Sequence, residues 1–258
     1  MTLFDINAAI GHWPFRHVPN EQPAELRALL TAKGVSGAAV VNTHGLFYLD
    51  CHDANRELAE AIGDHLDFFV GVATLNPAYP GWERDLSVCR ERLGLRALRL
   101  APQYHGYRLG GPESVAIARA AAELAMPLLV PHRVVDTRGR HHLDVEETVG
   151  LAELAALWES VPEATVIMTE VDYYGAKDLL REDGSLRYPN LYLDLSRMYE
   201  SLYGLPPDLA AERLLFGTGA PLKHITPALL KLQLAEVDEA ARRRIASENA
   251  RALLGLGS

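Results

Sequence analysis

The feature that most constrains the fold is a regular alternation of short apolar runs with amphipathic, helix-like stretches along the whole chain. Runs that are apolar throughout are typical of strands buried on both faces of a parallel sheet. Helix-like stretches separate them, for example Pro23–Lys33 ahead of Gly34, and Pro112–Ala125, where a proline opens the first turn. The eight expected strands are Leu3–Asn7, Gly37–Asn42, Phe68–Thr74, Leu95–Leu100, Pro127–Pro131, Thr165–Thr169, Leu191–Asp194 and Leu214–Gly217.

Eight such βα units predict one (β/α)8 TIM barrel that spans residues 1–258 as a single domain. The chain length agrees, because this barrel typically needs about 250 residues. A doubly wound open sheet is the rival fold, but it usually carries a glycine-rich phosphate turn after its first strand. The segment from Asn7 to His12 is no such turn, and no Gly-, Ser- or Pro-rich linker divides the sequence.

Charge and cysteine content narrow the class of partner. The formal net charge is −9 and no block of like charge occurs, so neither a nucleic acid nor an anionic membrane is expected as a partner. Cys51 and Cys89 are too few for a disulfide framework and lie in no zinc-binding pattern. We therefore expect a cytoplasmic protein that binds a small-molecule substrate, with a homo-oligomer left open.

Polar residues that follow the apolar runs give the candidate site, because active sites of these barrels lie at the carboxyl ends of the strands. The expected catalytic residues are Arg133, Glu170, His132 and Asp172. The expected substrate-binding residues are Asn7, His12, His44, His105, Arg197, Tyr199 and Thr218.

Several segments, in their order along the chain, resemble the amidohydrolase-related family of TIM-barrel hydrolases. They are Phe4-Asp5-Ile6-Asn7, with Gly11 and Trp13-Pro14-Phe15, then Asn190-Leu191-Tyr192-Leu193-Asp194-Leu195-Ser196, Arg213-Leu214-Leu215-Phe216-Gly217-Thr218-Gly219-Ala220-Pro221, and Glu248-Asn249-Ala250-Arg251-Ala252-Leu253-Leu254. The resemblance covers the whole chain and implies a barrel enzyme that acts on small carboxylated molecules or lactones.

The resemblance also implies a metal site whose ligands this sequence has largely replaced. The family's His-x-His pair after the first strand falls on Asn7 and Ala9. Its histidine after the sixth strand falls on Glu170, and its aspartate after the eighth falls on Gly219, which has no side chain to bind a metal. On the fifth strand the family position points to Pro131. Because strand side chains alternate, Arg133 shares the facing of Pro131, whereas His132 faces the other way.

We therefore expect no metal cofactor, because a site that activates water needs about three protein ligands. Zinc in a rebuilt site remains an alternative, with His12, His44, His105, His132 and Glu170 as conceivable ligands. Their mutual distances do not follow from the sequence.

The leading functional hypothesis is a hydrolase that acts on a small carboxylated or lactone-type substrate without the family's metal. Some lactonases of this superfamily work in that way. Arg133 or Arg197 would bind a carboxylate or a developing oxyanion, and Glu170 or Asp172 would act as general base. His132 and His105 are further candidates for proton transfer.

Three alternatives stay open. Glu170 and an arginine could form a purely structural ion pair at the barrel mouth. The chain could be a pseudoenzyme that binds a ligand or partner at the mouth without turnover. It could also be a metal-dependent hydrolase or decarboxylase with a rearranged ligand set.

Overall fold

The computed structural model describes residues 1–171, 178–183, 185–197 and 211–257. Eight parallel strands pair in sequence order to form one sheet. They are β1 (Leu3–Ile10), β2 (Val35–Asn42), β3 (Phe69–Thr74), β4 (Ala97–Arg99), β5 (Leu128–Pro131), β6 (Val166–Thr169), β7 (Leu191–Asp194) and β8 (Leu214–Leu215).

Backbone hydrogen bonds bring the first and last strands together. Ile6 N–H donates to the Phe216 carbonyl at 2.9 Å, and Ala9 N–H donates to the Ala220 carbonyl at 2.8 Å. Gly219 N–H donates to the Asn7 carbonyl at 2.7 Å between them. The sheet is thus a nearly closed barrel, and the predicted (β/α)8 architecture is confirmed.

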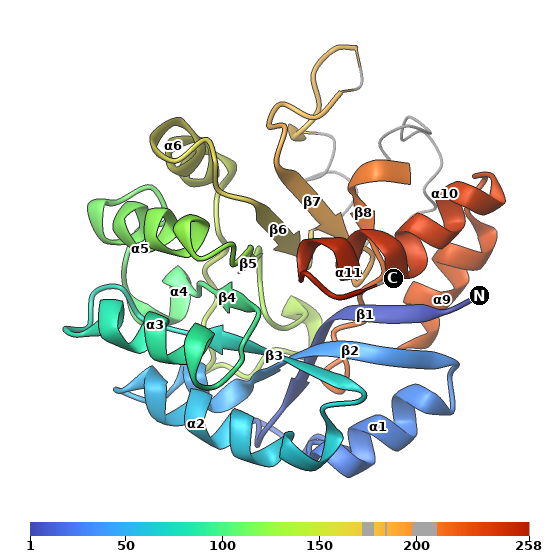
Figure 1. The fold of residues 1–258 in the computed structure, drawn as a ribbon, viewed down its shortest axis with the longest axis horizontal. Helices are drawn as coiled ribbons and strands as arrows, with labels where there is room; N and C mark the ends of the chain where they lie inside the picture. The colour runs from blue at the N-terminus through green and yellow to red at the C-terminus, as the bar shows by residue number, and fades with distance from the viewer. Residues whose placement is uncertain (172–177, 184, 198–210, 258) are drawn as a thin grey trace.

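Helices surround the ring of strands (Figure 1). They are α1 (Pro23–Thr31), α2 (Cys51–Ala61), α3 (Trp82–Glu91), α4 (Pro102–His105), α5 (Pro112–Glu123), α6 (Leu151–Ser160), α9 (Thr226–Leu234), α10 (Glu239–Arg243) and α11 (Asn249–Leu253), with a π-helical turn at Arg244–Glu248. No helix in these described parts of the chain is long and apolar enough to cross a bilayer.

Alternation along the strands separates two apolar cores. On β4, Leu98 packs in the outer core between strands and helices, whereas Ala97 belongs to the core inside the barrel. The inner core also receives Ala250 and Leu254 from the C-terminal end of the chain. Those two residues lie with Phe4 from β1, so α11 closes the amino-terminal end of the barrel and leaves the carboxyl end for a site.

A β-bulge interrupts this alternation on β1. Asp5 pairs with Ala38, but Ala8 already pairs with Val40, so β1 has one extra residue between the two pairs. A bulge re-aims the side chains beside it and is common next to active sites. Asn7 lies within this bulge and its side chain lines a pocket at the barrel mouth.

The strand boundaries differ modestly from those expected. β1 runs on to Ile10, while β4 and β8 are shorter than the apolar runs that predicted them. Apolar sequence extends beyond paired backbone because buried loop residues need apolar surroundings as much as strand residues do.

Candidate active site

A small pocket with a cavity volume of about 40 Å³ opens at the carboxyl ends of the strands. Its apolar lower wall includes Ala9, Val41 and Leu129, which belong to the core inside the barrel. Its polar groups are Asn7, Arg99, Arg133, Thr169 and Glu170, contributed by strands β1, β4, β5 and β6 or by the residues that follow them. Convergent polar groups above an apolar floor are typical of a small-molecule site.

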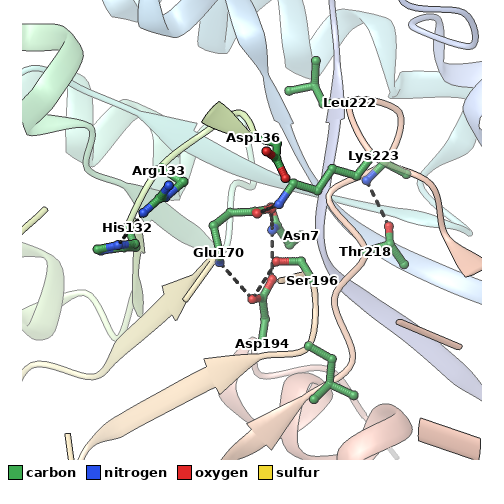
Figure 2. Close-up of polar contacts among 12 residues, drawn as sticks. Asn7, His132, Arg133, Asp136, Glu170, Asp194, Ser196, Thr218, Leu222 and Lys223 are labelled. Carbon is green, nitrogen blue, oxygen red and sulfur yellow. Dashed lines mark hydrogen bonds and ion pairs between the residues drawn. The ribbon is translucent and has the colours of Figure 1, made fainter. Parts of the chain in front are cut away.

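Glu170 is the centre of the polar network. Its side chain is almost fully buried, and one oxygen accepts a hydrogen bond from Asn7 Nδ2 at 3.2 Å. The other oxygen forms an ion pair with the ammonium of Lys223, which reaches across from the loop after β8 (Figure 2). The carboxylate of Glu170 thus has a cation on one oxygen and an amide donor on the other.

The backbone at Glu170 holds a conformation that few residues with a side chain adopt. Its φ is +66°, in the left-handed region. Such strain, of order 1–3 kcal/mol, persists where neighbouring contacts hold it and is common at functional sites. Asp194 supplies one such contact, because its Oδ1 accepts the Glu170 N–H at 3.0 Å.

Asp194 ends β7 and lies beneath the pair of Glu170 and Lys223. It accepts from Asn7 Nδ2 at 2.9 Å and from the Ser196 hydroxyl at 2.8 Å. The Asn7 amide therefore donates to two carboxylates at once (Figure 2). Burial raises the pKa of Asp194 to about 6, against the lowering effect of these hydrogen bonds.

Gly219 makes room for the ion pair. Its φ is +72°, and a Cβ built there would lie 2.8 Å from Glu170 Oε1 and 3.1 Å from Lys223 Cδ. Real Cβ atoms do not approach an oxygen so closely. The absence of a side chain at position 219 thus leaves space for the stem of Lys223 to reach Glu170 as it does.

Two buried lysines lie near this network. Burial lowers the pKa of Lys223 to about 7, with the negative charge of Asp136 acting in the opposite direction. Lys231 on α9 donates to the Leu195 carbonyl at 2.7 Å, and burial lowers its pKa to about 8. Burial thus disfavours the charged form of both amines, and for Lys223 the adjacent carboxylate of Glu170 favours the charged form.

A second carboxylate network supports β1 from behind. Asp5 is fully buried and accepts from the N–H groups of Asn7 and Thr218, both at 3.0 Å, and from the Thr218 hydroxyl at 2.5 Å. Burial raises the pKa of Asp5 to about 7, although these hydrogen bonds lower it. Thr218 thus donates both its N–H and its hydroxyl to Asp5, and these bonds position the backbone between Gly217 and Ala220.

Asp5→Asn is expected to flatten the pH dependence of stability between about pH 5 and pH 8. The pKa of Asp5 in the folded protein lies above the ordinary value of 3.8, so the folded state holds this proton more tightly than the unfolded state. Its contribution to stability is complete at low pH and is lost as pH rises through about 7. Asparagine imitates the protonated form and does not titrate. Urea unfolding of both proteins at pH 5 and pH 8 measures the difference, and equal pH slopes would contradict this assignment.

The structure distinguishes the two candidates on the strand β5 segment. Arg133 lines the pocket together with Pro131, in agreement with the expected alternation. His132 donates from Nδ1 to the Val149 carbonyl at 2.9 Å, and its Nε2 lies 3.3 Å from Arg133 Nη2. His132 thus holds the guanidinium of Arg133 from the side, and the pocket wall as described does not include it.

The other predicted histidines lie at the same mouth but do not gather at one point. His44 accepts the His12 N–H at 3.0 Å and lies 2.8 Å from Glu57, while His12 itself is exposed beside Glu21. His105 donates to the Gly45 carbonyl at 2.9 Å, and burial lowers its pKa to about 4. These contacts give the three rings roles in bracing loops, and their binding of a substrate stays a prediction.

The remaining predicted residues are placed as follows. Arg197 is buried just after β7. Asp172 and Tyr199 lie outside the described residues. The structure shows an ion pair of Glu170 with Lys223, whereas the structural alternative from the sequence paired Glu170 with an arginine.

Comparison with known proteins identifies the family to which this chain belongs. A family model of the amidohydrolases matches residues 12–256. The chain belongs to the amidohydrolase family. The expected resemblance is thus confirmed, and membership of this enzyme family supports an enzymatic role.

Solved structures share the amidohydrolase fold at low sequence identity. A 2,6-dihydroxybenzoate decarboxylase from Rhizobium has a TM-score of 0.73 and 16% identity, with 98% of each chain covered. A 5-carboxyvanillate decarboxylase from Sphingomonas paucimobilis has a TM-score of 0.71 and 14% identity over 99% of both chains. A dihydroxybenzoic acid decarboxylase from Polaromonas, with bound manganese and 2-nitroresorcinol, has a TM-score of 0.72 and 16% identity over 98% of this chain and 97% of that one. No curated protein sequence matches the chain.

The amidohydrolase resemblance assigns metal ligands to positions that here hold Asn7, Ala9, Glu170 and Gly219. Asn7 and Glu170 have oxygen atoms at the pocket, whereas Ala9 and Gly219 have none to offer. Across the described residues, no three or more His, Cys, Asp or Glu side chains are grouped so that they could hold a metal ion.

Two important residues of this amidohydrolase site escaped the sequence analysis. Arg99 is the last residue of β4 and was taken as part of an apolar run. Side-chain alternation along the strand could have revealed Arg99, because residues two positions apart on a strand point to the same face and Ala97 points inward. Lys223 lies four residues beyond Gly219 in a loop, and no spacing rule predicts how far its side chain reaches.

Proposed function

We propose that this amidohydrolase hydrolyses a small carboxylated ester or lactone without a divalent metal. The observation that carries the proposal is that Glu170 contacts both Lys223 and Asn7, where Glu170 and Asn7 stand at positions to which the resemblance assigns metal ligands. A metal ion would have to displace the ammonium, and it would then meet the carboxylate of Glu170 and the Nδ2 side of the Asn7 amide, which donates to Glu170 and Asp194. Those donors do not fit a divalent ion that needs about three good ligands.

The fixed cations of the pocket can supply the charge that hydrolysis requires. An ester carbonyl that is attacked by water develops negative charge on its oxygen, and positioned cations in a water-poor site stabilise that charge. Lys223, from the loop after β8, contacts Glu170, and Arg133, which follows β5, lines the same pocket. Lysine and arginine charges here would take the place of a Lewis acid.

Glu170 is proposed as the base. As water attacks the carbonyl carbon, Glu170 removes one water proton, and the oxygen–carbon bond forms. The tetrahedral intermediate then collapses, the bond to the leaving oxygen breaks, and the proton passes to the alkoxide that departs. The ammonium of Lys223 and the Asn7 amide together hold the Glu170 carboxylate in one orientation.

A turnover screen with and without chelator tests this proposal. We expect purified protein to hydrolyse at least one member of a panel of carboxylated esters and lactones, with a rate that is unchanged after dialysis against EDTA. Elemental analysis of protein purified without chelator is expected to find zinc, manganese and iron below one tenth of an equivalent. Chelator-sensitive turnover with stoichiometric metal would overturn the metal-free mechanism, and absence of turnover across the panel would favour a ligand-binding role.

Carboxylated aromatics belong in the panel for a specific reason. The solved structures with this fold include decarboxylases of 2,6-dihydroxybenzoate and 5-carboxyvanillate. Release of carbon dioxide from such acids, followed in the same assay, would assign decarboxylation in place of hydrolysis.

A further inference from the structure

Arg99 is an unusual residue for the inside of a barrel. Its side chain points inward from β4, above Ala97, and the residue is only 6% exposed. Among the ion pairs of the described residues, none involves Arg99. A buried charge without a counter-ion is costly, and a bound anion would offset that cost.

Neighbouring groups hold the guanidinium in one orientation. Arg99 Nε donates to the Thr74 hydroxyl at 3.0 Å, and Nη2 donates to the Asn42 carbonyl at 2.9 Å. An arginine has five N–H donors, so these two bonds leave three for another partner. Arg99 lines the pocket, so the remaining donors are available to a ligand that enters it.

The supports of Arg99 are themselves fixed. Asn55 from α2 donates to the Thr74 carbonyl at 2.9 Å and accepts the Thr74 N–H at 2.8 Å. Gly45 packs against Thr74 so closely that a Cβ would lie 2.9 Å from the Thr74 Cβ. A guanidinium that is positioned before the ligand arrives loses little conformational entropy on binding.

The surroundings favour an anion with an apolar body. Val41 and Leu129, from the strands on either side of this part of the barrel, line the pocket beside Arg99 and belong to the apolar inner core. Low polarity strengthens a charge-assisted hydrogen bond, and the planar fork of arginine matches the two oxygens of a carboxylate.

We propose that Arg99 is a carboxylate-binding residue at the base of the pocket, and that it selects substrates with a carboxylate on an apolar body. This inference rests on the proposed function only in naming the substrate of the same pocket. Asn55 and Thr74 are positioning residues, since they act through Arg99. The carboxylate would be seated below Glu170 and Lys223, with the group to be hydrolysed nearer the mouth.

Equilibrium binding of benzoate, with benzamide as its uncharged isostere, tests the proposal independently of turnover. In wild-type protein, benzoate is expected to bind by calorimetry and to raise the melting temperature, whereas benzamide does neither. In Arg99→Met, the Kd for benzoate is expected to rise at least tenfold, and Arg99→Lys is expected to lie between the two. Arg92→Met removes an exposed arginine at the end of α3, changes the net charge equally, and is expected to bind like wild type.

Thermal unfolding without ligand separates a functional role from a structural one. Removal of a buried cation that lacks a counter-ion is expected to leave the melting temperature of Arg99→Met at or above that of wild type. A strong fall in melting temperature would identify Arg99 as a structural brace and overturn the proposal. So would unchanged benzoate binding in Arg99→Met, or equal binding of benzoate and benzamide by wild type.

The two proposals can fail separately. If the hydrolysis screen finds no turnover but benzoate binding depends on Arg99, the carboxylate site stands and the hydrolase proposal falls. If turnover is found, Arg99→Met is expected to raise the KM for a carboxylated ester at least tenfold and to leave the KM of its neutral amide analogue unchanged. Equal KM values for the carboxylated substrate in wild type and Arg99→Met would refute the carboxylate site and leave the hydrolase proposal standing.

Discussion

Lys223→Met is expected to lower the free energy of unfolding by about 3–5 kcal/mol, because it leaves the buried carboxylate of Glu170 without its cation. Methionine has a similar length and an apolar stem, so it fills the space between Gly219 and Glu170 without adding a charge. The hydrogen bond from Asn7 Nδ2 remains, but an amide does not neutralise a carboxylate. Urea denaturation at neutral pH measures the loss.

The double variant Lys223→Met with Glu170→Gln is the matched control. Glutamine still accepts from Asn7 and carries no charge, so the double variant is expected to regain most of the stability that Lys223→Met loses. Equal stabilities for Lys223→Met and the wild type would show that Glu170 is protonated or solvated in the folded protein. In that case the buried ion pair could not provide the base that the hydrolase proposal requires.

Arg133→Lys is expected to slow turnover of a hydrolysed substrate by roughly ten- to a thousandfold, which corresponds to a loss of about 1.4 to 4 kcal/mol of charge-assisted bonding. Arg133 lines the pocket, and its guanidinium contacts His132 from one side. A planar fork held in this way can bind two oxygens of a substrate, and a lysine ammonium cannot reproduce that geometry. Steady-state kinetics on the best substrate of the screen gives the value of kcat/KM for each protein.

Stability separates this role of Arg133 from a structural one. Arg133→Lys and Arg133→Ala are expected to melt within a few degrees of the wild type while turnover falls. A large drop in melting temperature for both variants, with kcat/KM of the remaining folded protein unchanged, would make Arg133 a brace of the barrel mouth.

The barrel followed from the sequence because its strands are buried on both faces. Burial of that kind leaves apolar runs such as Leu191–Asp194, which no turn or exposed helix imitates, and their number and spacing predict the closed sheet. The alternation of side chains along one strand was equally informative. It predicted that Arg133 rather than His132 faces the pocket with Pro131, and the structure places them so.

The register between neighbouring strands and the reach of side chains from loops could not be predicted from the pattern within a single strand. The bulge at Asp5–Ala8 turns Asn7 toward Glu170 and Asp194, and it depends on the register of β1 against β2. The reach of Lys223 depends on a loop and on the space left by Gly219. The alternation of side chains along β4 could have identified Arg99 as an inward-facing residue, but its apolar neighbours led us to count it as part of the core.

The bare backbone at Gly219 links three positions in a way that restricts how they can vary. A side chain at 219 would crowd the Glu170 carboxylate and the stem of Lys223 and would strain the backbone, so a substitution there requires the ion pair to shift. A change at Lys223 alone leaves a buried carboxylate without its counter-ion, and a change at Glu170 alone leaves a buried ammonium without its counter-ion. Positions 170, 219 and 223 are therefore expected to mutate together in descendants of this sequence, and a carboxylate at 219 would have to arise through less stable intermediates unless the replacements occurred at once.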